Sequence, residues 1–92
     1  MSEERLRRRV VVKGEVQGVF FRDSTQSEAE SRGVDGWVAN RSDSSVEAVF
    51  EGDAEAVRAM VDFCKSGPSR ADVRDVEATE EEPEGLSGFE VR

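Results

Sequence analysis

The chain has 92 residues, of which 21 are Asp or Glu, 13 are Lys or Arg and none is His, so its formal net charge is −8 at neutral pH. This length supports one compact core at most, and no apolar run is long enough to span a bilayer. Because an acidic surface repels phosphate backbones, nucleic acid is not an expected partner. We therefore expect one domain over residues 1–92, a cytoplasmic monomer with neither nucleic acid nor a membrane as its partner.

Cysteine and histidine usage argues against a metal site. The lone Cys64 cannot form an internal disulfide, and without His there is no Cys/His zinc cluster. We expect no metal and no cofactor. We place Cys64 in the core, because it lies in the apolar stripe of the second predicted helix. We expect it not to act as a nucleophile, because no His can activate it. Lys13 and Lys65 are the only lysines. This acid-rich, lysine-poor balance is typical of proteins from salt-loving organisms, where salt screens self-repulsion; an ordinary acidic surface is the alternative.

The chain begins with a predicted strand and a predicted helix. Residues 6–13 are rich in valine and end at Gly14, which indicates a strand. Asp23 or Ser24 can cap a helix that ends at Gly33. Its apolar stripe is thin and consists of Phe21, Thr25 and Ala29.

A hairpin is predicted next. Trp37 and Val38 lie in a short strand, and residues 45–51 alternate between apolar and mostly polar positions. The apolar face of this second run consists of Val46, Ala48 and Phe50. The turn between the two strands contains Ser44 where an Asp-Gly turn would have glycine. We therefore expect a turn of a different type or a longer one.

The second half predicts a helix and two further strands. Asp53 can cap a helix that ends at Gly67. Its apolar residues recur at helical spacing and are Val57, Met60, Val61 and Cys64. Residues 71–78 alternate with a change of phase, which indicates a strand with a bulge near Arg74. Residues 89–91 form a very short last strand.

This order of elements predicts the fold. Strand, helix, strand, strand, helix and strand, with one short extra strand, indicate an α+β fold of the ferredoxin-like split βαβ (βαββαβ) type. In this sandwich an antiparallel sheet carries two helices on one face. The first and second strands run parallel, with the third between them. Their carboxyl ends therefore lie at the same edge of the sheet.

The stretch GEVQGVFFR, residues 14–22, connects the first strand to the first helix. Gly14 and Gly18 permit positive φ values, so successive N–H groups can converge into a nest for an anion. The start of the helix adds further free N–H groups. The loop suits a phosphate, although two glycines alone also fit a tight turn. It is neither the dinucleotide-binding fingerprint nor a Walker loop.

Two polar side chains are candidates for a site at this edge. Arg22, in the first turn of the helix, can bind two phosphate oxygens with its planar guanidinium. Asn40 lies near the carboxyl end of the second strand, at the same edge of the sheet. Taken singly, Arg22 fits a surface ion pair and Asn40 a turn residue. Together with the loop they indicate an anion site.

These motifs resemble those of the acylphosphatase family. GEVQGVFFR, GWVANRSDSSVEAVFEG and GPSRADV match it, and the likeness covers residues 10–91. The resemblance implies a metal-free enzyme, of a halophilic type by its composition, that hydrolyses acyl phosphates to carboxylate and inorganic phosphate. It implies that Arg22 binds the phosphoryl group and that Asn40 orients the attacking water. It also implies a cradle of backbone N–H groups from Val16, Gln17, Gly18, Val19 and Phe20.

The chemistry of an acyl phosphate suits these residues. The leaving carboxylate has a conjugate acid with a pKa near ~4, so no general acid is needed and the lack of His is no obstacle. An arginine and convergent N–H groups can stabilise the charge on the transferred phosphoryl group without a covalent intermediate. Asn40 can hold a water in line but is no base, so a substrate oxygen or bulk water takes the proton.

Glu15 departs from the family pattern, in which a basic or neutral polar residue is common at this position. A carboxylate beside an anion site weakens substrate binding at low salt. We therefore expect Glu15 to point to solvent and added salt to relieve the repulsion.

A ferredoxin-like module that binds RNA or a small anion without catalysis is the alternative function. An RNA-binding sheet needs stacked aromatic residues beside basic ones, whereas SVEAVFE offers only Phe50 flanked by acids. One cluster of basic residues could favour RNA binding, and it consists of Arg5, Arg7, Arg8 and Arg9. We expect this cluster to frame the first strand and offset acidic neighbours.

Overall fold

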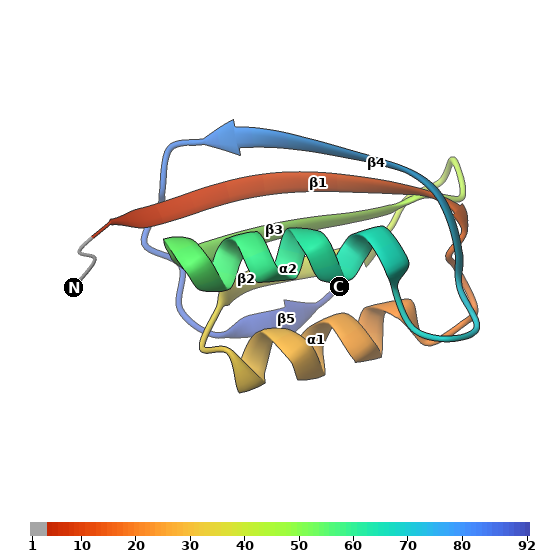
Figure 1. Cartoon of the computed structure of the whole chain (residues 1–92), viewed down its shortest axis with the longest axis horizontal. Coiled ribbons are helices and arrows are strands. Elements are labelled where there is room, and N and C mark those ends of the chain that lie inside the picture. The colour runs from red at the N-terminus through yellow and green to blue at the C-terminus, as the bar shows by residue number, and fades with distance from the viewer. Residues whose placement is uncertain (1–3) are drawn as a thin grey trace.

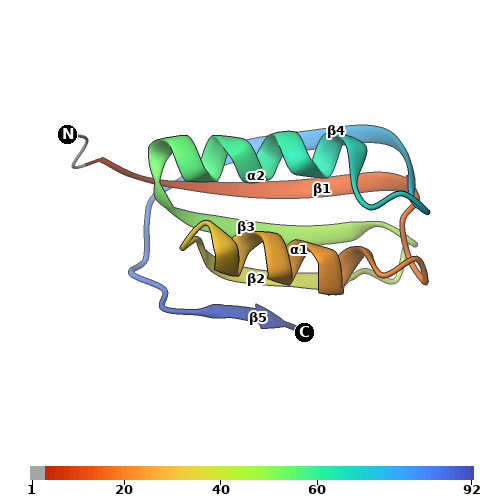
Figure 2. The ribbon, with the colours of Figure 1, turned by 60° about the horizontal axis from the view of Figure 1, so that its bottom comes forward.

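A computed structural model describes residues 4–92, which form a five-stranded sheet with both helices packed on one of its faces (Figures 1 and 2). The elements in chain order are β1 Arg5–Glu15, α1 Phe21–Ser31, β2 Asp35–Asn40, β3 Val46–Asp53, α2 Ala54–Ser66, β4 Asp72–Glu81 and β5 Phe89–Val91. The predicted order of elements and the predicted split βαβ sandwich are confirmed. Within the described residues, no helix is long and apolar enough to cross a membrane.

The strand order is β4-β1-β3-β2-β5. β3 pairs antiparallel with both β1 and β2, so β1 and β2 run in the same direction on either side of it, as expected. The four longer strands form the expected antiparallel sheet, and the short β5 adds a parallel pair with β2 at one edge. The segment of residues 82–88 crosses the end of the sheet from one edge to the other (Figure 2). β5 therefore starts from the sheet end at which β4 finishes.

The main core lies between the sheet and the helices. The predicted stripe of α2 is buried at Val57, Met60 and Cys64, and Val61 packs against its rim. The thin stripe of α1 is buried as expected, at Phe21, Thr25 and Ala29. These helices cover the sheet residues Val10, Val12, Val38, Ala48 and Phe50, all of which are at most 1% exposed. A fully buried valine or phenylalanine side chain contributes about 1.5–3 kcal/mol.

The two helices start differently. At α2 the predicted cap is confirmed, since the Asp53 side chain accepts a hydrogen bond from the Glu55 N–H. At α1 the predicted caps Asp23 and Ser24 are wrong, because the helix already begins at Phe21. The residue before it, Phe20, adopts a left-handed conformation with φ 63°, and no side chain of the described residues caps the helix. The N–H groups of the first turn of α1 therefore lack a side-chain partner.

The predicted bulge near Arg74 is confirmed. On β1, Lys13 pairs with Asp75 and Gly14 pairs with Val73, so Arg74 is the extra residue of β4. Gly14 has φ 130°, and a Cβ atom at this position would lie 2.2 Å from the carbonyl oxygen of Asp72. Gly14 is thus required by the close approach of β4, and this glycine belongs to the sheet rather than to the loop that follows.

Candidate functional site

A pocket of about 260 Å³ opens at the end of the sheet where β1 and β2 finish. Its lining residues come from the loop after β1, the start of α1 and the end of β2, and they are Val16, Gly18, Phe20, Phe21, Arg22, Asp23 and Asn40. The structure thus brings Arg22 and Asn40 into one pocket together with three of the five predicted cradle residues. Gln17 and Val19 do not line it.

Two residues of the loop have the positive φ values that occur in anion nests. Gly18 and Phe20 both have positive φ values, 75° and 63°. In the part of the chain that the structure describes, no atom lies within 4 Å of the place where a Cβ of Gly18 would be, so its backbone conformation, not space, favours glycine there. Phe20 is 65% exposed and holds a conformation that costs a non-glycine residue about 1–3 kcal/mol. The uncapped start of α1 follows directly and adds free N–H donors to the pocket.

Arg22 lies in the first turn of α1 and is partly buried. Its Nη1 donates a hydrogen bond of 3.0 Å to the main-chain carbonyl oxygen of Arg92, beyond the end of β5. Within residues 4–92, no Asp or Glu side chain forms an ion pair with Arg22. A guanidinium has five N–H donors, so most of those of Arg22 remain available to an anion in the pocket.

Asn40 is the last residue of β2 and is exposed. Its side-chain amide has no hydrogen-bond partner within the part of the chain that the structure describes. The amide can therefore bind water or substrate through its oxygen and its nitrogen.

Sequence reasoning treated Gln17 only as a backbone donor and missed its side chain. Nε2 of Gln17 donates hydrogen bonds to the carbonyl oxygens of Arg41 and Ser45, at 2.8 and 2.9 Å. These contacts connect the loop after β1 to the hairpin between β2 and β3. No local sequence signal reveals them, because they join segments that are distant along the chain.

The hairpin itself has a three-residue loop, longer than the Asp-Gly turn. The Arg41 N–H donates to the Ser45 carbonyl, and the Ser44 N–H donates to the Arg41 carbonyl. Ser44 occupies the left-handed position, φ 76°, that glycine usually takes in such loops. The Asp43 carboxylate accepts hydrogen bonds from the Ser45 hydroxyl and N–H, and these lower the pKa of Asp43. The turn therefore presents ordered carbonyl groups to Gln17.

The remaining chemistry-bearing residues lie away from the pocket lining. Cys64 is buried in α2, and this burial raises the pKa of its thiol to about 12, so it stays protonated at neutral pH. Glu15 is exposed, as expected, and does not line the pocket. Within residues 4–92, no group of three or more His, Cys, Asp or Glu side chains is placed to hold a metal ion.

Together, the fold and the pocket define a class: a small split βαβ sandwich with a pocket at the end of its sheet, lined by the loop after β1, by Arg22 and by Asn40. The acylphosphatase family model matches residues 8–91. An acylphosphatase of Haloarcula marismortui, a halophilic archaeon, is 55% identical over 94% of both chains. One of Rubrobacter xylanophilus is 59% identical, over 91% of this chain and 77% of its own. The crystal structure of acylphosphatase from Bacillus subtilis has a TM-score of 0.91 and 40% identity, covering 95% of this chain and 98% of that one. The chain belongs to the acylphosphatase family.

Proposed function

We propose that the chain hydrolyses acyl phosphates to carboxylate and inorganic phosphate by in-line attack of water, with the phosphoryl group bound by Arg22 and the loop, and the water oriented by Asn40. Hydrolysis of acyl phosphates is the activity of the family to which the chain belongs. The observation that carries these residue roles is that Arg22, Asn40 and the uncapped start of α1 line one pocket.

The loop and Arg22 form the binding part of this mechanism. Backbone N–H groups of residues 16–20 and the first turn of α1 surround the phosphoryl oxygens, and the Arg22 guanidinium donates to two of them. The transferred phosphoryl group spreads its charge over three equatorial oxygens in the transition state. Fixed donors around these oxygens stabilise that charge without reorganising during the reaction.

Asn40 forms the other part. Its amide oxygen accepts a hydrogen bond from a water molecule and holds it opposite the bond to the leaving carboxylate. The carboxylate leaves without protonation because its conjugate acid is strong. The attacking water gives its proton to a phosphoryl oxygen or to bulk water. No covalent intermediate and no general acid enter this path.

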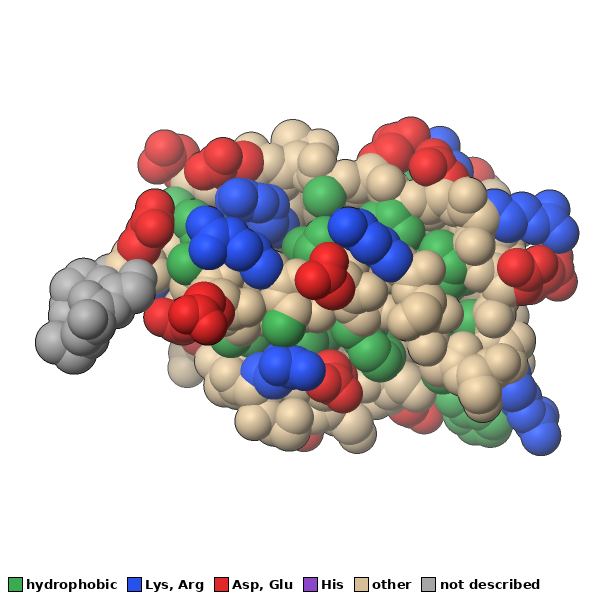
Figure 3. Space-filling model, viewed as in Figure 1, with side chains coloured by type: hydrophobic (Ala, Val, Ile, Leu, Met, Phe, Trp, Pro, Cys, Tyr) green, Lys and Arg blue, Asp and Glu red, His purple; other side chains and the backbone are tan. Residues whose placement is uncertain are grey.

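The proposal also covers the setting of the enzyme: a cytoplasmic monomer with one domain over residues 1–92, a small-molecule substrate, and neither nucleic acid nor a membrane as partner. Ion pairing supports the exclusion of nucleic acid, because the basic cluster of β1 is neutralised by carboxylates. Arg5, Arg7, Arg8 and Arg9 all form ion pairs with Asp or Glu. On the face that carries the helices, basic and acidic side chains are interspersed (Figure 3). Such a surface offers no basic track for a phosphate backbone.

Salt dependence belongs to the same proposal. Glu15 is exposed beside the loop, where its charge repels an approaching anion and is screened by salt. We expect kcat/KM to rise with added salt in the native chain and to rise less in a Glu15→Gln variant.

One assay separates this enzyme from a module that only binds an anion. Benzoyl phosphate and acetyl phosphate are incubated with the chain, and inorganic phosphate release is measured against the uncatalysed rate. Binding of inorganic phosphate is measured in parallel by calorimetric titration. Catalysed release from acyl phosphates supports the proposal, whereas phosphate binding without turnover would identify a non-catalytic anion-binding module. Binding of single-stranded RNA in place of phosphate would identify the RNA-binding alternative.

A further inference from the structure

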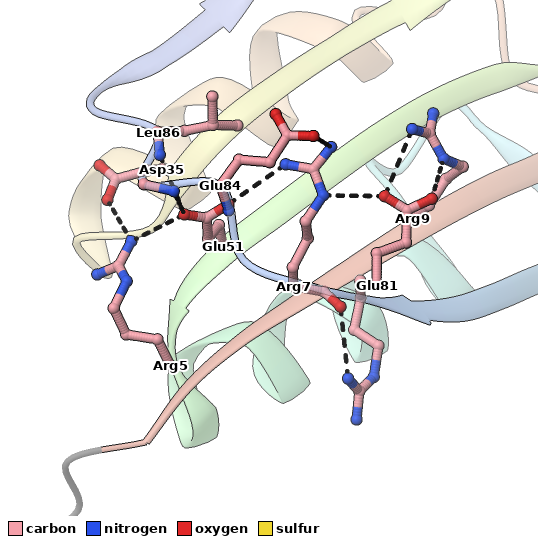
Figure 4. Close-up of polar contacts among 10 residues, drawn as sticks. Arg5, Arg7, Arg9, Asp35, Glu51, Glu81, Glu84 and Leu86 are labelled. Atoms are coloured by element: carbon pink, nitrogen blue, oxygen red, sulfur yellow. Dashed lines mark hydrogen bonds and ion pairs between the residues drawn. The ribbon is translucent and has the colours of Figure 1, made fainter.

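A buried carboxylate, that of Glu51 in β3, lies on the sheet face away from the helices and outside the pocket (Figure 4). Its side chain is 0% exposed. Burial raises the pKa of a carboxyl group, but hydrogen bonds from backbone N–H groups and from Arg5 outweigh it and lower the pKa of Glu51 to about 2. Glu51 is therefore ionised at neutral pH, and such a buried charge needs its partners in place.

Three of these partners belong to the segment between β4 and β5, residues 82–88, which we call the C-terminal strap. The N–H groups of Glu84, Gly85 and Leu86 donate to the Glu51 carboxylate at 3.0, 2.6 and 3.0 Å. A carboxylate accepts all three because its two oxygens offer about four acceptor sites. Glu51 thus fixes the middle of the strap to β3.

Arginine side chains of β1 complete the contact. Nη1 of Arg7 donates to Glu51 at 3.3 Å, and its Nε donates to Glu81 at 2.9 Å. Arg5 reaches the other oxygen of Glu51 at 3.3 Å. Arg7 is only 4% exposed, so its pair with Glu51 is shielded from solvent. Its Nη2 also lies 3.7 Å from the Glu84 carboxylate, so the strap is held to β1 as well.

The strap determines where β5 begins. At its far end the Gly88 N–H donates to Asp35 at 2.9 Å, and β5 starts at the next residue. β5 has three residues and, among the strands of residues 4–92, pairs with β2 alone. Strands this short at a sheet edge are weakly held by their own hydrogen bonds. The contacts of the strap are therefore a substantial part of what keeps β5 in place.

β5 in turn contacts α1 near the pocket. It runs from the sheet end that carries the strap back towards the end that carries the pocket (Figure 1). Nε2 of Gln26 donates to the Phe89 carbonyl at 3.0 Å, and Nη1 of Arg22 donates to the Arg92 carbonyl at 3.0 Å. Within residues 4–92, this carbonyl is the one acceptor of the Arg22 guanidinium. Arg92 itself is held by its N–H, which donates to the Val38 carbonyl at 2.8 Å.

We propose that Glu51 is a positioning residue for Arg22: it fixes the C-terminal strap, the strap holds β5, and the Arg92 carbonyl after β5 keeps the Arg22 guanidinium aimed at the pocket. The inference rests on the proposed phosphate-binding role of Arg22. An arginine side chain has many rotamers, and holding it in one of them before the substrate arrives lowers the entropy cost of binding.

The test replaces Glu51 with glutamine, which keeps the volume but leaves one acceptor oxygen for three N–H groups and removes the charge that faces Arg7. We expect the Kd for inorganic phosphate and the KM for benzoyl phosphate to rise together by about 3- to 10-fold, with a smaller fall in kcat. Hydrogen exchange at the Arg92 amide should accelerate relative to amides of β1. The matched control is Glu47→Gln, on the same strand and sheet face, whose ion pair is with Arg9 and not with the strap.

Each measurement separates the possible outcomes. Unchanged phosphate affinity in a folded Glu51→Gln chain, or unchanged Arg92 exchange, would overturn the inference, and so would an equal effect of Glu47→Gln. If the native chain binds phosphate but releases none from acyl phosphates, the proposed function is refuted. The inference can still be tested in that case, by comparing the Kd for phosphate of the native chain with that of Glu51→Gln. If Glu51→Gln does not fold, Asp35→Ala removes the acceptor of the Gly88 N–H at the other end of the strap and should weaken phosphate binding in the same direction.

Discussion

The side-chain amide of Gln17 donates a hydrogen bond to the main-chain carbonyl of Ser45, 2.9 Å away and 28 positions along the chain. Through this contact the loop after β1 and the hairpin after β2 form one unit. Arg22 follows the loop and Asn40 precedes the hairpin. The contact therefore fixes the positions of these two proposed site residues relative to each other. The amide acts on the backbone of the site and does not line the pocket.

Replacing Gln17 with alanine should loosen this unit. Two hydrogen bonds are lost, each of which contributes about 0.5–1.5 kcal/mol, and two carbonyls lose a partner. We expect kcat/KM for benzoyl phosphate to fall about 10-fold while the chain remains folded. Ser42→Ala is the control, since it lies in the same hairpin and its hydroxyl takes no part in the contact. Equal activities of the two variants would show that the loop keeps its shape without Gln17.

Replacing Arg22 with lysine tests the binding half of the site. The charge remains, but the planar pair of donors is lost, so both phosphate binding and turnover should weaken. By analogy with the loss of one oxyanion-hole donor, we expect kcat to fall by about 10² to 10³. Arg32→Lys, just after the opposite end of α1, should have no effect. A variant of Arg22 with native kcat would remove this residue from the mechanism.

Replacing Asn40 with alanine tests the other half. Because its amide is proposed to hold the water and not the phosphate, turnover should be abolished while binding of inorganic phosphate stays within about twofold of native. Steady-state kinetics and a phosphate titration measure the two properties separately. Loss of phosphate binding together with turnover would assign Asn40 to the phosphate and contradict the division of roles.

Local patterns predicted the elements well, whereas contacts between distant segments were not predictable. The cap of α2 at Asp53 and the bulge at Arg74 depend on a few neighbouring residues, and both were found where the sequence indicates them. The expected cap of α1 was wrong because the loop enters the helix through a left-handed Phe20. Such a conformation opposes local preference and is maintained by the surrounding structure.

The same reasoning explains why the face of the sheet away from the helices was not foreseen in detail. Alternation along β3 assigns Glu51 to the face opposite Phe50, where a carboxylate is normally exposed. It is buried because the strap, 33 to 35 positions further on, brings three N–H groups to it. The parallel pairing of β5 depends on the same crossing. In the pocket, the approach of Arg22 and Asn40 was foreseeable from topology, whereas the side-chain contact of Gln17 was not.

Replacing Ser44 with glycine should stabilise the chain. Its φ of 76° lies in the left-handed region, which costs an L-residue about 1–2 kcal/mol, and glycine avoids that cost while adding some entropy to the unfolded chain. We expect a net gain of about 0.5 kcal/mol, seen as a small rise in Tm, with kcat/KM unchanged. Ser42→Gly, in the same turn but without a positive φ, should lower Tm instead. If both variants shift Tm in the same direction, conformational strain at Ser44 is not the cause.

Acid should remove the stabilisation that Glu51 provides. Its pKa is lowered from 4.5 to about 2 in the folded chain, so the unfolded chain binds more protons as the pH falls. The contribution of Glu51 is about 3 kcal/mol, is complete above pH 4.5 and is lost progressively towards pH 2. Urea unfolding of the native chain and of Glu51→Gln at several pH values measures it as a difference. The lowered pKa values of Glu81 and Asp43 affect both chains and largely cancel in this difference. We expect the difference in free energy of unfolding between the two chains to narrow as the pH falls from 4.5 towards 2. A difference that stays constant over this range would show that the charge of Glu51 is not what stabilises the strap.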